Sequence, residues 1–208
     1  ENLHPHNTTR ALQEFWLNDL SRGYIQIVRD RLSSDDEAVK HVLSEVYLIL
    51  LKLSSPFVPF ITEKIWQELK VKGIVKEESI HLEDWPKSDS KKIDEKLENN
   101  FQLAMKVIEK GMSERDTVKI GLRWPLSKAH VEMKESITEN VKKIIEKQLN
   151  VKSVEIRKTE STDIVVKLNT VMTAELEAEG FSRELARKIQ AERKQNGLKK
   201  GDLIDLKI

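Results

Sequence analysis

The chain has 208 residues, with 36 Lys and Arg against 35 Asp and Glu, so its formal net charge is +1. An apolar fraction of 38% with so small a net charge excludes an intrinsically disordered chain. The sequence contains no Cys, which excludes disulfides, thiolate metal sites and cysteine nucleophiles. The absence of Cys also fits a reducing setting, so we expect a cytoplasmic protein. No apolar run is long enough to span a bilayer, so we expect no membrane partner.

Apolar residues at helical spacing predict a series of helices in the first half of the chain. The predicted helices cover about residues 9–32, 37–53, 61–70 and 94–112, and residues 80–86 are predicted to be extended. The second helix is apolar over most of its circumference, which favours a central place among the others. Helices joined by short loops predict a helical bundle over residues 1–115.

A different pattern begins near residues 113–118 and predicts a small α/β module over residues 116–208. Short β-branched or alternating runs predict strands at about 119–122, 129–132, 151–156 and 163–168. A capping box at residues 136–139 is expected to open a helix to about Leu149, and a last helix covers about 182–195 before Gly197. Residues 203–208 alternate like a strand without a partner, so we expect a truncated module. The predicted fold class is mostly α.

The sequence lacks the patterns of common catalytic sites. It has neither type of Gly-rich phosphate loop and no G-x-S-x-G nucleophile turn. His4 and His6 form the only close histidine pair in the sequence. Because they lie beside the N-terminus, a solvated tail is favoured over a metal site. We therefore predict no catalytic residue and no metal ligand in this chain.

One stripe of the first predicted helix is polar and basic, and it is a candidate RNA-contacting face. Asn18, Arg22 and Arg29 recur along it, and Tyr24 can stack on an unpaired base. A solvated helix face explains the same stripe, so both interpretations stay open. Trp16 falls on the apolar side, which favours core packing.

A second group of basic and aromatic residues lies in the α/β module. Arg123 and Trp124 stand together in a predicted loop, where binding residues often occur, although Trp beside Pro is also common in packing. Arg183, Arg187 and Lys194 lie close to one face of the last helix and suit an RNA backbone. A solvated helix is again the alternative.

Several segments, in order along the chain, resemble class I aminoacyl-tRNA synthetases. Residues 53–66 resemble the APFxPFxTExIW segment of the helical anticodon-binding domain shared by the isoleucyl, valyl and leucyl enzymes. Residues 79–86 resemble the SVHLxDWP segment that follows it, and residues 17–31 look like a bundle helix. Residues 120–126, 149–154 and 180–190 are similar to the KLRWPL, LNVKxV and GFxREVxRRIQ segments of archaeal-type isoleucyl enzymes.

The resemblance implies the C-terminal anticodon-binding region of an archaeal-type isoleucyl-tRNA synthetase: a helical bundle followed by a small α/β module. The HIGH, KMSKS and editing regions of the family are absent from this sequence. The chain is therefore not expected to be an enzyme by itself or to hold a cofactor, whereas the intact family enzyme attaches isoleucine to its tRNA using ATP and Mg²⁺. The implied partners are isoleucine tRNA and the catalytic and editing domains of the same chain.

The expected tRNA-binding residues are the nine named above, taken from their stripes and their positions in the family segments. They are Asn18, Arg22, Tyr24, Arg29, Arg123, Trp124, Arg183, Arg187 and Lys194. Two alternatives remain open at this point. One is the equivalent region of a valyl- or leucyl-tRNA synthetase, and the other is a structural protein-interaction module of a synthetase complex.

Overall fold

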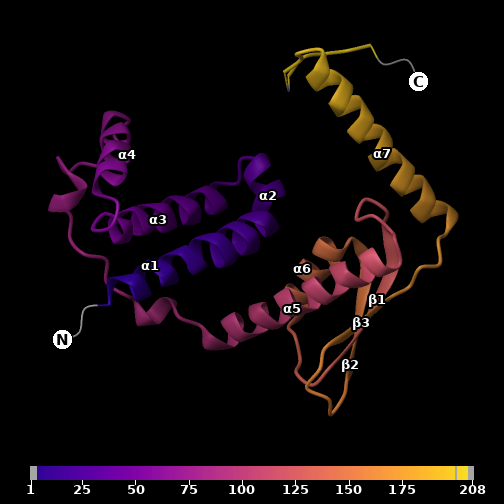
Figure 1. Ribbon diagram of the computed structural model, residues 1–208. Helices are drawn as coiled ribbons and strands as arrows, with labels where there is room; N and C mark the ends of the chain where they lie inside the picture. Colours follow the sequence, from indigo (N-terminus) through magenta and orange to yellow (C-terminus); the bar gives the residue numbers. More distant parts are fainter. Residues whose placement is uncertain (1–3, 200, 206–208) are drawn as a thin grey trace. The chain divides into compact units, whose positions relative to one another are not determined.

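A computed structural model describes residues 4–199 and 201–205, and it is mostly α-helical with one small sheet (Figure 1). This confirms the predicted fold class. The chain divides into two compact units, residues 1–93 and 94–208. None of the helices in the described ranges combines the length and apolar character needed to cross a bilayer.

The first unit consists of helices joined by short connections. Its elements are α1 (Pro5–Glu14), the π-helix η1 (Phe15–Ile25), α2 (Gln26–Ser33), α3 (Glu37–Ser54), α4 (Pro59–Val71) and the 3₁₀ turns η2 (Ile80–Leu82) and η3 (Ser90–Lys92). The backbone stays helical where α1 meets η1 and where η1 meets α2. The predicted first helix is therefore confirmed, with a π-helical middle. The extended segment predicted at residues 80–86 begins instead with η2.

Local capping explains where the helices of this unit begin. The Asp36 carboxylate accepts hydrogen bonds from the backbone N–H groups of Ala38 and Val39 and caps α3. Pro59 stands in the first turn of α4, where its missing N–H costs nothing. A small core of Leu51, Trp66, Val75 and Ile80 then joins α3, α4 and η2.

The second unit is built around a three-stranded sheet. Its elements are α5 (Glu95–Thr117), β1 (Leu126–Met133), α6 (Glu139–Leu149), β2 (Val151–Lys158), β3 (Val165–Leu168) and α7 (Ala174–Gln195). The strand order is β2-β1-β3, with β1 parallel to β2 and antiparallel to β3. Helices α5 and α6 lie side by side against the sheet (Figure 1). One apolar core therefore joins α5, α6 and all three strands.

The division between the compact units lies earlier in the chain than the predicted domain boundary between residues 115 and 116. They divide between Ile93 and Asp94. The physical reason is that α5 contributes Ala104, Val107 and Ile108 to the core it shares with the sheet. Periodicity shows that a helix is amphipathic, but it does not show which neighbour covers the apolar stripe.

Several local predictions in the second unit are wrong. Residues 119–122 form turns rather than a strand, and Lys119 has a positive φ of 57°. The capping box does not form: α6 is capped at Thr138 with no side-chain cap, and the Thr138 N–H donates to Asn100 Oδ1 at 3.1 Å. Helix α7 begins at Ala174, well before the predicted start, because Thr173 caps it. Residues 203–205 are not a strand, and 206–208 lie outside the described residues.

Candidate nucleic-acid interface

A chain of side-chain hydrogen bonds runs along one side of the continuous helix that α1 and η1 form. We call this continuous helix the first helical segment. Asn18 Nδ2 donates to Glu14 Oε1 at 2.6 Å, and Arg22 Nη1 donates to Asn18 Oδ1 at 3.1 Å. The three residues are four positions apart, so they follow one side of the helix. Arg22 has five N–H donors in a planar fork, and this hydrogen bond occupies one of its nitrogens. The remaining donors can bind a phosphate while Asn18 holds the guanidinium in place.

The other predicted residues of this unit lie nearby along the sequence but do not join that chain of bonds. Tyr24 is half-buried, and the exposed Arg29 donates to Gln26 Oε1. Trp16, which was expected in the core, is 43% exposed. The described contacts of the first unit thus bring Asn18 and Arg22 together and leave Tyr24 and Arg29 as separate candidates.

Arg31 has a structural contact instead. Its Nε donates to Asp36 Oδ2 at 2.9 Å, across the turn between α2 and α3. The hydrogen bond from Arg31, helped by the backbone N–H groups that Asp36 caps, holds the pKa of that carboxyl below its usual value. Arg31 therefore ties two helices together through the α3 cap.

In the second unit, a buried arginine holds the loop that carries Arg123 and Trp124. Arg115 is only 2% exposed and its guanidinium donates to backbone carbonyls rather than to a carboxylate. The acceptors are the carbonyl oxygens of Leu149 (2.9 Å), Gly121, Trp124 and Asn150 (3.1 Å each) and Ile120 (3.5 Å). Arg115 thus fastens the end of α5 to the following loop and to the end of α6.

The buried Arg115 has an electrostatic cost that its hydrogen bonds offset. Desolvation lowers the pKa of this guanidinium, but an arginine stays charged because its ordinary pKa is so high. A buried charge is tolerated when its donors are satisfied. The conformation of the loop that carries Arg123 and Trp124 therefore depends on Arg115, whose guanidinium donates to several backbone carbonyls at once.

Trp124 anchors the first half of α7. A Cβ placed on Gly180 would lie 2.3 Å from Cε3 of the indole, so only glycine allows this approach. Phe181, the next residue, meets Trp124 edge-on, with ring centroids 5.1 Å apart and an interplanar angle of 75°. Ion pairs add to this docking: Lys152 Nζ lies 2.5 Å from Glu179 Oε2 and Arg123 Nε lies 3.8 Å from Glu184 Oε2. The indole therefore has a packing role, whatever else it contacts.

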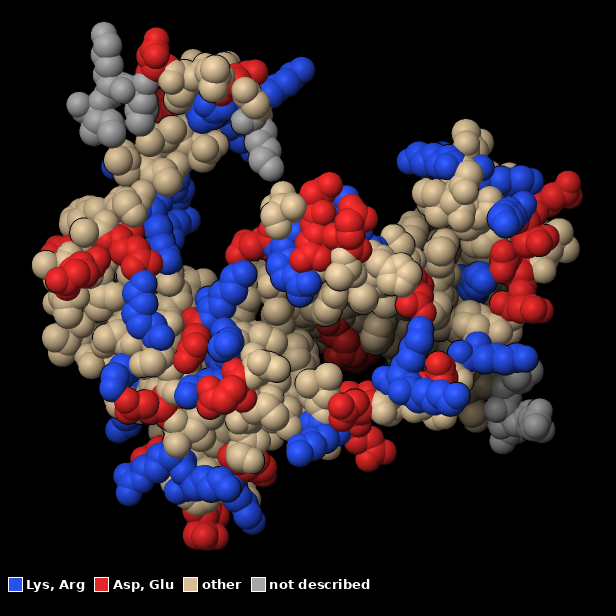
Figure 2. All heavy atoms as spheres, turned by 180° about the vertical axis from the view of Figure 1, so that it is seen from behind, with Lys and Arg blue, Asp and Glu red and all other residues tan. Residues whose placement is uncertain are grey.

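The basic residues of α7 are partly paired within the helix. Arg183 Nη2 lies 2.5 Å from Glu179 Oε1, and Arg187 Nε lies 2.9 Å from Glu184 Oε2. In the part of the chain that the structure describes, Lys188 and Lys194 have no carboxylate within 4.0 Å. Figure 2 shows the same mixture of Lys and Arg with Asp and Glu over the visible face. Such exposed pairs are weak, so a phosphate can replace the carboxylate.

The structure brings Arg123, Trp124 and Arg187 together around Glu184, and it adds residues that the predicted site did not include. The additions are Glu14 on the first helical segment and Phe181 and Lys188 on α7. Glu14 could have been found from its spacing of four residues before Asn18. For Phe181, the only feature of the sequence that pointed to a functional role was its place in the segment that resembles GFxREVxRRIQ.

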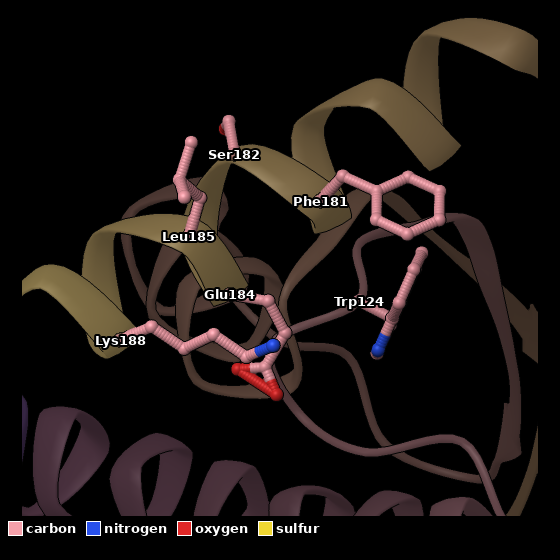
Figure 3. A pocket seen from close by; sticks show the side chains of 6 residues that line it. All are labelled: Trp124, Phe181, Ser182, Glu184, Leu185 and Lys188. Carbon is pink, nitrogen blue, oxygen red and sulfur yellow. The ribbon is translucent and has the colours of Figure 1, made fainter. Parts of the chain in front are cut away.

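The described residues contain no cluster of His, Asp or Glu side chains placed to hold a metal ion. They do form a hollow of about 480 Å³ on the second unit, lined by Trp124, Phe181, Ser182, Glu184, Leu185 and Lys188 (Figure 3). Its walls combine aromatic surface with one cation and one carboxylate.

A family model described as the anticodon-binding domain of tRNA ligase matches residues 1–133. The chain belongs to this family. The matched residues include all of the first unit and continue through α5 and β1 of the second.

Curated relatives carry the name isoleucine–tRNA ligase. The chain is 36% identical over 170 residues to the protein of Thermococcus kodakarensis, covering 77% of this chain and 16% of the relative. It is 35% identical over 178 residues to that of Pyrococcus abyssi, covering 81% and 16%. For Pyrococcus horikoshii the identity is 37% over 191 residues, covering 86% and 17%. The resemblance to archaeal isoleucyl enzymes is confirmed, and the chain spans about one sixth of the length of these relatives.

Proposed function

We propose that this chain is the tRNA-binding, anticodon-recognising part of an isoleucyl-tRNA synthetase. The observation that carries the proposal is the match of residues 1–133 to the anticodon-binding domain of tRNA ligases. The relatives described above are isoleucine–tRNA ligases, which favours isoleucine tRNA over the valine and leucine tRNAs. None of the matches reported above is to a valyl or leucyl enzyme or to a protein-interaction module.

The proposed RNA-binding residues divide between phosphate contacts and base contacts. On the first unit, Arg22, held by Asn18, and Arg29 would neutralise phosphates, and Tyr24 would stack on a base. On the second unit, Arg123, Arg183, Arg187 and Lys194 would follow the backbone, and Trp124 would contribute an aromatic edge. Because Arg123, Arg183 and Arg187 each have a carboxylate neighbour, RNA binding would exchange existing ion pairs for phosphate contacts.

The whole enzyme would supply the chemistry. We propose that the intact protein attaches isoleucine to its tRNA with ATP and Mg²⁺, and that catalytic and editing domains of the same chain hold these ligands. The present chain would contribute binding and discrimination in the cytoplasm. An ATP–pyrophosphate exchange assay on this chain alone is expected to show no exchange above background.

Fluorescence anisotropy with three labelled RNAs tests the proposal. The probes are isoleucine tRNA, the same tRNA with an exchanged anticodon, and valine tRNA, each titrated over a series of salt concentrations. We expect the tightest binding to the native isoleucine anticodon. Equal affinity for all three RNAs would indicate sequence-independent binding to the phosphate backbone and would contradict anticodon recognition by this chain.

A further inference from the structure

The hollow on the second unit has features of a site rather than of a packing defect. Phe181 forms one wall and is 58% exposed, although it is a large apolar side chain in the first half of α7. The indole of Trp124 contacts the Phe181 ring edge-on and holds it on one side. That indole is itself held against Gly180, so the aromatic wall is preorganised.

Charged side chains frame the aromatic wall. Glu184 and Lys188 line the hollow one helical turn apart, and Figure 3 shows the Lys188 side chain extending toward Glu184. Arg187 donates to Glu184 Oε2 at 2.9 Å, and Arg123 lies 3.8 Å from the same oxygen. Three cations therefore surround a single carboxylate, and the local charge is positive beside an open aromatic face.

We propose that this hollow binds an unpaired nucleobase of an RNA, stacked on Phe181, with the adjoining phosphate held by Lys188. The inference rests on the proposed function and adds a binding position to it. A nucleobase is flat and presents a π-face, which matches the free face of Phe181, and RNA carries the negative charge that the surrounding cations favour. A protein segment would also cover the ring, but an apolar segment would leave the excess positive charge around Glu184 unmatched, and an acidic segment offers no flat π-face to stack on Phe181.

A series of substitutions at Phe181 separates stacking from general apolar contact. The probes are labelled isoleucine tRNA and a labelled single strand with its anticodon-loop sequence, titrated into the 208-residue chain. We expect Phe181→Ala and Phe181→Leu each to weaken binding by about tenfold, and Phe181→Trp to retain it, because stacking requires a π-face. The backbone amide NMR signals of Ser182 and Leu185 should shift when the wild-type chain meets the single strand. Because the ring is more than half exposed, these variants should still fold, and their melting temperatures should fall only by the small contribution of the edge-on contact with Trp124.

Three further variants complete the test. Lys188→Gln should reduce the slope of log affinity against log salt by about one, and Lys188→Arg should restore it. Phe60→Ala removes a ring that is 90% exposed on α4 and serves as the matched control, with unchanged affinity expected. An equal loss for Phe60→Ala would contradict a specific site.

The outcomes distinguish this inference from the proposed function. A wild-type chain that does not bind tRNA contradicts the function itself. Tight tRNA binding that is unchanged in Phe181→Ala contradicts only the nucleobase site, and so does retention of affinity in Phe181→Leu. Wild-type self-association in analytical ultracentrifugation that disappears in Phe181→Ala, with RNA affinity unchanged, would assign the hollow to a contact between protein chains.

Discussion

The two compact units differ in how completely they bury their apolar side chains. The second unit has a continuous core in which Leu126, Met133, Ile145 and Leu149 are fully buried. The first unit has a core of Leu51, Trp66, Val75 and Ile80 with a few half-buried neighbours, while large apolar side chains on η1 and α4 stay exposed.

Stability and candidate binding residues are therefore distributed unequally between the two units. Burial of apolar surface is the main favourable term in folding, so the second unit should resist unfolding more than the first. The candidates on the first unit are side chains on a helix with few buried neighbours. The candidate binding residues of the second unit lie on the 118–124 loop and on α7. Arg115 holds this loop and Trp124 holds α7 against the continuous core of the unit.

The largest effect is expected from Arg115→Met, which keeps apolar volume but removes every donor of the buried fork. Backbone carbonyls of the 118–124 loop and of the end of α6 lose their partner, so the free energy of unfolding of the second unit should fall by about 3 kcal/mol. Urea denaturation followed by circular dichroism measures this. Arg157→Met is the matched control, because that side chain is 82% exposed and its loss should change little. Equal stabilities for the two variants would show that the buried fork is not needed.

The counterpart in the first unit is Trp66→Phe. The indole is 1% exposed and its N–H donates to the Glu77 carbonyl at 3.1 Å, so the substitution leaves both a small cavity and an unpaired acceptor. The expected loss is about 2 kcal/mol in the first unit alone. Hydrogen exchange of the α3 and α4 amides should rise, while that of β1 stays unchanged. Faster exchange in both units would contradict the separation of their cores.

A binding prediction concerns the polar stripe of the first unit. Arg22→Ala should weaken isoleucine tRNA binding by about fivefold and lower the salt slope by about one, because it removes one phosphate contact. Arg10→Ala, an exposed arginine on α1 outside the chain of bonds, is the matched control with a smaller expected change. An unchanged dissociation constant and salt slope for Arg22→Ala would remove this residue from the interface.

The smallest effect is a dependence of stability on pH in the first unit. Although desolvation opposes it, hydrogen bonds from Gln67, Ser79 and the Ile80 N–H lower the pKa of Glu63 below its usual 4.5. A depressed folded-state pKa stabilises the protein above the unfolded value, and the contribution is lost as the pH falls through the folded value. Glu63→Gln should therefore flatten the decline in melting temperature below about pH 4.5. A slope identical to that of the wild type would show that Glu63 titrates as in the unfolded chain.

Strong helical periodicity predicted much of the fold. The helix predicted at 37–53 is α3, the one at 61–70 lies within α4, and the strand at 151–156 lies within β2. These segments have a clear apolar face or a β-branched run, and both patterns are local. The strand predicted at 119–122 is wrong because the shape of these turns depends on Arg115, whose acceptors include residues 34 and 35 positions away.

The candidate site was harder to predict than the fold. Spacing alone placed Asn18 and Arg22 on one side of a helix, and the structure joins them by a hydrogen bond. Sequence did not show that Trp124 packs on Gly180 or that Phe181 stands exposed beside it, since these contacts span more than fifty residues. It also overstated the free charge on α7, because Arg183 and Arg187 pair with glutamates of the same helix.

Footprinting of isoleucine tRNA tests whether this chain binds the anticodon arm. The RNA is probed by hydroxyl radicals and by base-specific reagents, with and without the 208-residue chain. We predict protection of the anticodon stem and of the loop bases, with the acceptor end as reactive as in the free RNA. Protection confined to the acceptor arm, or spread evenly over every helix, would contradict an anticodon-binding role for this chain.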